Sequence, residues 1–218
     1  MFKEIKELNY EDYWKIRGAK LRKKLMDREF IFMKWIKDGS AVLNIACGNS
    51  SFLLELKKRK GCQVEGFDIS SLVVEEQKRA DIEACVKDIN NKEFKIDKNY
   101  DYIILSEILE HLALPENLIS KIKNRTKFLL ISIPNSVFYR FRFSLFFKGR
   151  FFKQWFYHPS EHLRFWSHLD FKDWLDGLGL EIIKYEAANG LDIGPIKIFK
   201  FWPNLFGHQI CYLVKNKK

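Results

Sequence analysis

Short apolar runs alternate with amphipathic stretches through the middle of this chain. The apolar runs predict strands over 41–46, 63–68, 84–88, 100–106 and 127–133. Stretches with helical spacing follow the first, second and fourth of them, including 52–60 and 71–79. Strands that alternate with helices are typical of parallel βαβ crossovers, so we expect a sheet that helices cover on both faces.

The two ends of the chain follow other patterns. Helical spacing predicts helices over 1–38, before a turn at 37–40. After a long aromatic segment, the pattern predicts a helix over 169–178 and strands over 181–186 and 208–214. The chain has 218 residues, enough for one α/β domain with an embellishment.

Composition narrows the class of protein. The chain is 47% hydrophobic and 30% charged, which is ordinary for a globular domain. No CxxC pair occurs, so neither a disulfide framework nor a thiolate zinc site is indicated and a reducing compartment fits best. The start of the sequence has no apolar signal region, and no run approaches the roughly 20 apolar residues of a spanning helix. We therefore expect a cytoplasmic protein. The four cysteines are Cys47, Cys62, Cys85 and Cys211.

Polar residues follow the predicted strands where a parallel sheet would leave a crevice. Small residues at 44–49 lead into a helix, which lets a ligand approach backbone amide donors. Asp68, about twenty residues later, can accept both hydrogen bonds from a ribose diol. Asp88 can accept from an adenine amino group, with the amide of Ile89 serving the ring. These positions predict a nucleoside-bearing cofactor.

Five motifs in order carry a resemblance to class I S-adenosylmethionine-dependent methyltransferases over residues 40–135: VLNIACGNSSFL, VEGFDIS, VKDIN, YDYIILSEILEHL and FLLISIPN. A nicotinamide-binding fold is the rival for the first two motifs, but it predicts neither SEILEHL nor the later H-x-R-F-W-S segment. The resemblance implies a Rossmann-like three-layer sandwich with a mostly parallel seven-stranded sheet, an antiparallel last strand, N-terminal helices and an aromatic and basic insertion after strand 5.

The same resemblance implies one domain over 1–218 with four parts. These are an N-terminal helical cap (1–38), a cofactor-binding core (39–135), a substrate-side insertion (136–168) and a C-terminal helix and strands (169–218). It also implies S-adenosylmethionine as cofactor and S-adenosylhomocysteine as product. The implied cofactor residues are Asn44, Ala46, Cys47 and Gly48 for the methionine part, Asp68 and Ile69 for the ribose, Asp88 and Ile89 for the adenine, and Ser106, with Glu107, at the mouth.

Three positions depart from the family pattern. Asn44 replaces the usual acid at the end of the first strand, Ala46 replaces the first loop glycine, and Ser50 replaces a small residue. Asn44 keeps a carbonyl acceptor for the methionine ammonium but loses the charge. The alternative to productive binding is weakened binding in a degenerate pseudo-enzyme.

Within this class the chain resembles the MetW-like proteins of methionine biosynthesis most closely. The resemblance covers most of 30–214 and is carried by FMKWIKDGSAVLNIACG, IPNSVFYRFRFSLFFKGRF and FWPNLFGHQICYLV. The SEILEHL block is more similar to ubiquinone-type O-methyltransferases. MetW-like proteins are associated with homoserine O-acyltransferase, so the resemblance also implies a partner or regulatory protein of that enzyme, with a vestigial or sensory cofactor site.

Glu107, Glu110 and His111 are spaced i, i+3 and i+4, so a helix would project them to one side near the methyl group. With His162 they are candidate catalytic residues and candidate ligands of a divalent ion. This set resembles the E-x-x-E-H and later His of small-RNA 2′-O-methyltransferases. The alternatives are solvated first-turn acids with satisfied histidines, or His111 as a metal-free general base. His158 and His168 lie near the same segment and compete with His162.

The segment 136–156 combines many rings with five cations and no acid. It is interpreted as a lid over the substrate, as an interfacial membrane helix that buries Phe138, Phe141, Leu145 and Phe146, as a nucleic-acid platform, or as core or dimer packing. The N-terminal Tyr10-x-x-Tyr13-Trp14-x-x-Arg17 is similar to segments that fold over the cofactor cleft, although core packing of Tyr10 and Trp14 is the competing role. The cations are Arg140, Arg142, Lys148, Arg150 and Lys153.

The net charge, 38 cationic minus 28 anionic side chains, is +10 and favours phosphate-bearing partners. We therefore expect O-methylation of a small polar or anionic acceptor, for example a phosphorylated one. RNA methylation is a further alternative, although no RNA-binding appendage is recognisable. Peripheral membrane contact is compatible with the basic insertion, and a transmembrane segment is not expected.

Overall fold

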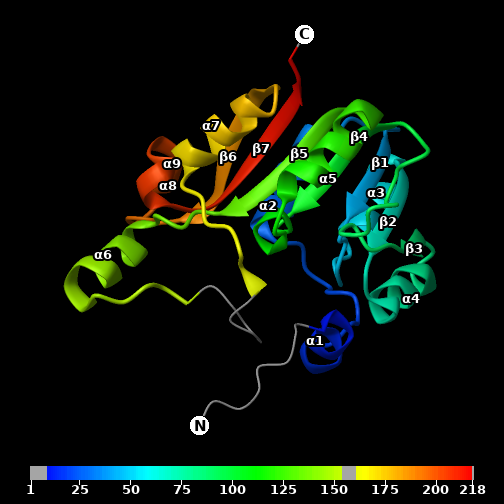
Figure 1. Ribbon diagram of the computed structural model, residues 1–218, viewed down its shortest axis with the longest axis horizontal. Helices are drawn as coiled ribbons and strands as arrows, with labels where there is room; N and C mark the ends of the chain where they lie inside the picture. Colours follow the sequence, from blue (N-terminus) through cyan, green and yellow to red (C-terminus); the bar gives the residue numbers. More distant parts are fainter. Residues whose placement is uncertain (1–8, 154–160, 218) are drawn as a thin grey trace.

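The computed structural model describes residues 9–153 and 161–217 and contains one seven-stranded sheet of order β3-β2-β1-β4-β5-β7-β6 (Figure 1). The first five strands are parallel, and β7 is antiparallel to both β5 and β6. This topology confirms the predicted α/β fold and its antiparallel last strand. The strands are β1 (Ala41–Ile45), β2 (Gln63–Asp68), β3 (Glu83–Val86), β4 (Tyr100–Ser106), β5 (Thr126–Pro134), β6 (Leu180–Gly190) and β7 (Gly207–Asn216).

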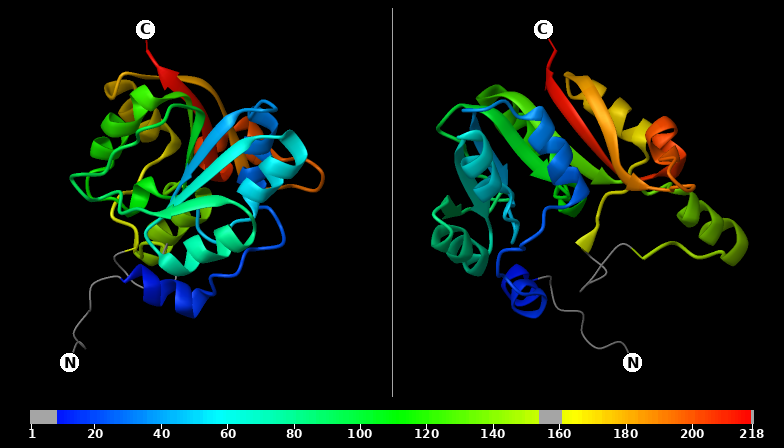
Figure 2. Two further views of the ribbon diagram at one scale, coloured as in Figure 1. Left: turned by 90° about the vertical axis from the view of Figure 1, so that its right-hand side faces the viewer. Right: turned by 180° about the vertical axis from the view of Figure 1, so that it is seen from behind.

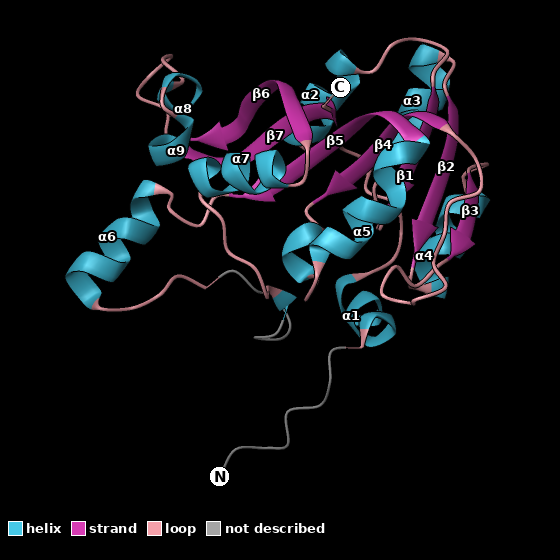
Figure 3. Cartoon of the chain, turned by 45° about the horizontal axis from the view of Figure 1, so that its top comes forward, coloured by secondary structure: helices cyan, strands magenta, loops and turns pink. Residues whose placement is uncertain are grey.

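Two apolar clusters on opposite faces of the sheet make the three layers. One cluster joins the sheet to α2 (Asp27–Trp35), α3 (Phe52–Lys60) and α4 (Ser71–Arg79). The other joins it to α5 (Pro115–Ile122) and α7 (His168–Gly177), which lie in front of the sheet in Figure 3. Strand side chains alternate between the clusters, as Val42 and Leu43 do, because successive residues of a strand point to opposite faces.

The remaining helices are shorter or more peripheral, although Leu109 and Phe199 still reach the second cluster. They are α1 (Tyr10–Arg17), α6 (Tyr139–Lys148), α8 (Ile198–Phe201), α9 (Pro203–Phe206) and the short 3-10 helices η1 (Leu109–His111) and η2 (Lys123–Arg125). Figure 2 shows α1 beyond one end of the strands and α6 projecting from the body. No helix among the described residues is long and apolar enough to cross a membrane.

The sequence located the strands well and some helices less well. The predicted helices over 1–38 are α1 and α2 with non-helical chain between them, and residues 1–8 lie outside the described residues. The strand predicted over 84–88 is 83–86, so Asp88 lies in the following loop. After β4 the chain forms a single turn of 3-10 helix before α5, where the spacing of Glu107, Glu110 and His111 assumed an α-helix. Glu107 precedes that turn in a left-handed conformation, with φ of 54°.

The strand order reverses between β1 and β4, so the chains leaving these two strands turn to opposite sides. Such a switch point leaves a crevice at the carboxyl ends of the strands. The loop after β1 turns through left-handed conformations at Ala46 and Gly48, with φ of 54° and 56°. Gly66 in β2 gives this loop room, since a Cβ there would lie 3.0 Å from the Cys47 sulfur. The fold therefore builds its crevice where the sequence predicted the cofactor loop.

Candidate functional site

A cavity of about 750 Å³ opens at this switch point. All nine predicted cofactor residues line it, as do all four predicted catalytic residues. Further lining residues come from the N-terminal segment, including α1 and α2. The structure thus brings together predicted residues as far apart in the chain as Asn44 and His162. The predicted lining residues are Asn44, Ala46, Cys47, Gly48, Asp68, Ile69, Asp88, Ile89, Ser106, Glu107, Glu110, His111 and His162.

Asp68 and Asn44 are buried polar side chains of the cavity wall. The carboxylate of Asp68 accepts hydrogen bonds from the Gly48 amide at 2.9 Å and the Ser70 amide at 3.0 Å. Burial raises the pKa of Asp68, although these backbone donors oppose the rise. The side-chain oxygen of Asn44 has no hydrogen-bond partner among the described residues. A buried acceptor without a partner is costly, so this oxygen is ready for an external donor.

Residues that sequence reasoning missed hold the loop in shape. Gln77 of α4 donates to the carbonyl oxygens of Gly48 and Ser50, at 3.0 and 2.9 Å. Glu29 of α2 is buried and accepts from Arg22 at 2.7 Å and from the Ser50 hydroxyl at 2.6 Å. These supports come from elements far along the chain, and helical periodicity gives no signal for which polar residue of a helix turns inward.

Helix α1 forms a roof over the loop. Trp14 lies above Gly48, where an added Cβ would be 3.4 Å from the indole ring. Glu11 accepts hydrogen bonds from the Ser70 hydroxyl at 3.0 Å and from the Ser71 amide, which ties α1 to the start of α4. Tyr10, Trp14 and Arg17 line the cavity, so α1 covers it as the resemblance implied. Burial and the nearby acids raise the pKa of Tyr10 to about 12.

The mouth of the cavity is formed by the end of β4. Arg28 of α2 donates from Nε to the Ser106 hydroxyl at 2.9 Å, and Ser132 lies 3.2 Å from the same oxygen. Glu107 accepts from the Gln209 amide at 3.1 Å with one carboxylate oxygen, while the other has no partner among the described residues. Burial raises the pKa of Glu107, and the Arg28 charge opposes the rise. Neither Arg28 nor Gln209 was predicted from the sequence.

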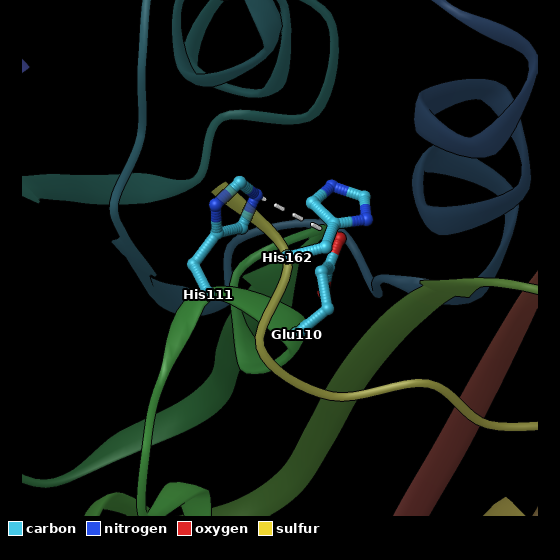
Figure 4. Close-up of side chains that lie close together, drawn as sticks. All are labelled: Glu110, His111 and His162. Carbon is cyan, nitrogen blue, oxygen red and sulfur yellow. Dashed lines mark ion pairs between the residues drawn. The ribbon is translucent and has the colours of Figure 1, made fainter. Parts of the chain in front are cut away.

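Glu110, His111 and His162 lie together in the cavity wall (Figure 4). One ligand atom from each lies within 4.8 Å of the others, and the imidazole rings meet edge to face at 4.8 Å. Glu107 is not in this group of the described residues, because its left-handed backbone turns it out of the helical register that the sequence assumed. The candidate metal set is therefore three residues rather than four.

Burial disfavours a positive charge on the two imidazoles of this cluster. Glu110 is fully buried and neither carboxylate oxygen has a hydrogen-bond partner among the described residues, although His111 Nε2 lies 4.0 Å from one of them. Burial, and then the charge of Glu107, raise the pKa of Glu110 well above its usual range. Burial, and then the neighbouring His162, lower the pKa of His111 to about 4, so its imidazole is neutral at pH 7. The cluster can accept a proton or a cation.

The other described histidines lie elsewhere. His168 is buried at the start of α7, where its Nδ1 lies 2.8 Å from the Tyr212 hydroxyl. His208 packs against the rings of Phe138 and Phe141. His158 lies outside the described residues. His168, one of the two competitors of His162, therefore does not line the cavity.

Plant N-methyltransferases match part of the chain. N-methyltransferase 4 of Papaver somniferum is 30% identical over 100 residues, which is 42% of this chain and 28% of that protein. The (S)-tetrahydroprotoberberine N-methyltransferase of Eschscholzia californica is 35% identical over 83 residues, or 35% of this chain and 24% of that protein. These matches span about a quarter of the length of the curated relatives.

Solved structures match nearly the whole chain in fold. A TehB-like methyltransferase from Corynebacterium glutamicum has a TM-score of 0.60 and 15% identity, covering 96% of this chain and 97% of that one. Coclaurine N-methyltransferase bound to N-methylheliamine and S-adenosylhomocysteine has a TM-score of 0.58 and 16% identity, covering 86% of this chain and 72% of that one. At these identities the likeness shows the fold alone.

The family match covers more of the sequence than either plant relative does. The family described as "Methionine biosynthesis protein MetW" matches residues 26–214, from the start of α2 through most of β7. Together with the sheet order and the structural neighbours, this match confirms the resemblance drawn from the motifs. The chain belongs to the MetW family, and its fold is that of the class I S-adenosylmethionine-dependent methyltransferases.

Proposed function

We propose that this chain is an S-adenosylmethionine-dependent methyltransferase that acts on a small polar acceptor. The observation that carries the proposal is the single cavity lined by all nine residues that the motifs assign to the cofactor. A cavity of about 750 Å³ lies in the range of small-molecule and cofactor sites. The plant relatives are named as N-methyltransferases, which supports methyl transfer as the reaction class.

The residues present fit the cofactor. Asp68 would accept from the ribose hydroxyls, and Asp88 with the Ile89 amide would hold the adenine. The unpartnered Asn44 oxygen would accept from the methionine ammonium, so the amide that replaces the usual acid still offers an acceptor. When bound, the sulfonium supplies an already activated methyl group, so the protein's task is to align the acceptor and exclude water.

The acceptor side supports the expectation of an oxygen nucleophile on a polar or anionic molecule. Arg17 and Arg28 line the cavity and would offer guanidinium groups to a carboxylate or phosphate, whereas Arg22 is paired with Glu29. The neutral His111 can take the proton that leaves a hydroxyl. A screen of hydroxyl and amine acceptors tests this choice: methyl transfer to anionic hydroxyl compounds supports it, whereas transfer to amines alone contradicts it.

Calorimetric titration with S-adenosylhomocysteine tests the cofactor site. We expect saturable one-to-one binding that Asp68→Ala abolishes, because the substitution removes both ribose acceptors and a support of the loop. Asp97→Ala, which removes an exposed carboxylate outside the cavity, is the matched control and should bind normally. Unchanged affinity in a folded Asp68→Ala protein would refute the ribose assignment.

Glu110, His111 and His162 are further proposed as the site of a divalent ion. One carboxylate and two neutral imidazoles suit a transition-metal ion, which would hold the acceptor and lower the pKa of its hydroxyl. Cobalt(II) is the probe, because tetrahedral or five-coordinate sites give visible absorption bands. We expect bands that Glu110→Gln and His162→Asn remove and that His208→Asn, outside the cavity, retains. Absence of cobalt binding by the parent protein would leave His111 as the base without a metal.

A partner role for homoserine O-acyltransferase is the second candidate. The family match and the replacement of the usual acid by Asn44 favour it. Co-purification with an acyltransferase, without methyl transfer to any acceptor in the screen, would support this role over the catalytic one.

A further inference from the structure

Helix α6 carries some of the most exposed large apolar side chains of the described structure, Phe146 and Phe147 among them. It projects from the body in Figure 1 and in the right-hand view of Figure 2, and none of its ten residues is buried. No residue of 136–153 lines the cavity, whereas Glu161 and His162, which follow the undescribed part of the insertion, do. None of the described rings of the insertion therefore faces this cavity. Neither core packing nor a lid over the substrate explains why the rings of α6 are exposed.

A continuous ladder of rings runs from α9 onto α6. Ring centroids are 5.9 Å apart for Trp202 and Phe206, 5.8 Å for Phe206 and Tyr139, and 6.3 Å for Tyr139 and Phe143. The ladder continues from Phe143 to Phe147 at 5.6 Å and from there to Phe146 at 4.9 Å. We call these six residues the ring surface.

Helical geometry places the α6 residues of the ring surface on one side of the helix. Tyr139, Phe143, Phe146 and Phe147 are spaced i, i+4, i+7 and i+8, so they share one face of α6. Phe146 is 82% exposed, Phe147 is 70% exposed and Trp202 is 60% exposed. Large rings at this exposure, contiguous over two elements, mark an interaction site.

Two of the rings that the sequence assigned to a membrane helix point elsewhere. Phe138 is buried, and Phe141 stacks on Phe152 with centroids 4.0 Å apart. These two rings anchor α6 to the body, together with the hydrogen bond from Arg142 to the Asn204 carbonyl. Contacts on the inner side of α6 hold the helix in place, so the rings on its outer side are presented to solvent in a fixed position.

Cations surround the ring surface and acids are absent from the same segment. Residues 136–153 contain no Asp or Glu. Arg140 and Arg142 lie to either side of the aromatic face of α6, and Lys148 and Arg150 follow Phe147. This pattern of a ring face bordered by long cationic side chains is typical of elements that lie in a membrane interface, where rings enter the acyl boundary and cations reach lipid phosphates.

We propose that the ring surface binds an anionic lipid bilayer, with Phe143, Phe146 and Phe147 inserted and the neighbouring cations at the headgroup phosphates. A second copy of this chain is disfavoured as occupant, because two such surfaces would bring like charges together. A convex helix that projects from the body suits a fluid surface, whereas it would need a matching groove on a protein. Binding of an acidic protein is the alternative that the experiment must separate.

Cosedimentation with vesicles tests the proposal. We expect binding to phosphatidylcholine vesicles that contain about one-third phosphatidylglycerol, and at least tenfold weaker binding to phosphatidylcholine alone. The double substitution Phe146→Ser, Phe147→Ser should weaken binding about tenfold or more, since two inserted rings are lost. Leu114→Ser, at an exposed apolar residue remote in sequence from this surface, is the matched control. Charge reversal by Lys148→Glu, Arg150→Glu should have a similar effect, which Lys23→Glu, Lys24→Glu should not.

Two further readouts make the result decisive. Brominated lipid should quench part of the tryptophan fluorescence, and Trp202→Phe should reduce that quenching, because Trp202 belongs to the ring surface. Binding of S-adenosylhomocysteine, unchanged in every variant, shows that the variants are folded and keeps this test independent of the proposed reaction. Equal binding by the ring-surface variants and their controls, or no binding to anionic vesicles, overturns the proposal; capture of an acidic protein by this surface without lipid binding overturns it in favour of a protein partner.

Discussion

Burial raises the pKa of three acids of the cavity, Asp68, Glu107 and Glu110, but their surroundings differ. Asp68 is held by backbone amides, which favour the carboxylate, so it is suited to accept hydrogen bonds. Glu110 has no hydrogen-bond partner among the described residues, so a proton or an arriving cation would compensate its charge. The number of donors around each acid therefore separates a cofactor-binding acid from an acid suited to a cation or proton.

The lowered pKa of His168 makes the stability of the folded protein depend on pH. Burial, and then the charge of Lys172, lower its pKa from 6.5 to about 4 in the folded state, so the unfolded chain binds a proton first as the pH falls. We expect the free energy of unfolding to decrease by about 2 kcal/mol between pH 6.5 and 4, and to be insensitive to this group above pH 7. Denaturant unfolding of the parent protein and of His168→Gln as a function of pH checks this. Parallel curves for the two proteins would contradict it.

Sequence reasoning located residues that line the cavity, but not the residues that support them. Strand ends are readable from apolar runs, and parallel strands bring their carboxyl ends to one edge, so Asp68 and Asn44 could be assigned. Glu29, Arg28 and Gln77 could not, since a helical pattern does not specify which polar side chain turns toward a distant loop.

At the scale of elements, the end of β6 lies very close to the α8–α9 segment that leads into β7. A Cβ at Gly190, the last residue of β6, would lie 1.9 Å from the Phe206 carbonyl oxygen and 2.5 Å from the Phe199 Cβ. The short helices α8 and α9 can therefore fold over the end of β6 only because no side chain is present there. No sequence pattern marked these two helices, because each has only four residues.

Substitutions at two glycines test this packing. Gly190→Ala should lower the free energy of unfolding by about 3 kcal/mol, because the Cβ meets backbone that must shift. Gly177→Ala, in the last turn of α7 with open space around its Cβ, should raise it by about 0.5 kcal/mol. Chemical denaturation measures both, and a Gly190→Ala protein as stable as the parent would show that the α8–α9 segment is not packed as described.

At the scale of the whole molecule, the cavity lies between the sheet and an N-terminal roof. Helix α1 packs Trp14 against the apolar cluster of α2 and α3, covers the cavity and is tied to α4 by Glu11. A ligand enclosed in this way leaves when the roof moves, so the contacts of α1 should govern the rate of release.

Glu11→Ala tests the roof. Loss of its two hydrogen bonds to the start of α4 should increase the dissociation rate of S-adenosylhomocysteine about fivefold. Asp12→Ala is the matched control, because Asp12 bonds within α1 to Lys15. Stopped-flow tryptophan fluorescence, with Trp14 against the loop, follows the release. Equal rates for both variants would indicate that α1 does not limit departure.

The position of β7 has a consequence for how the protein is made. This strand follows β5 and β6 in the chain, yet it pairs between them. While a ribosome is still translating residues 207–216, β5 and β6 each present an open edge that only β7 will fill. Open edges of apolar strands invite pairing with other chains. The nascent protein therefore passes through a stage in which chaperone binding at these edges should determine the yield of folded molecules.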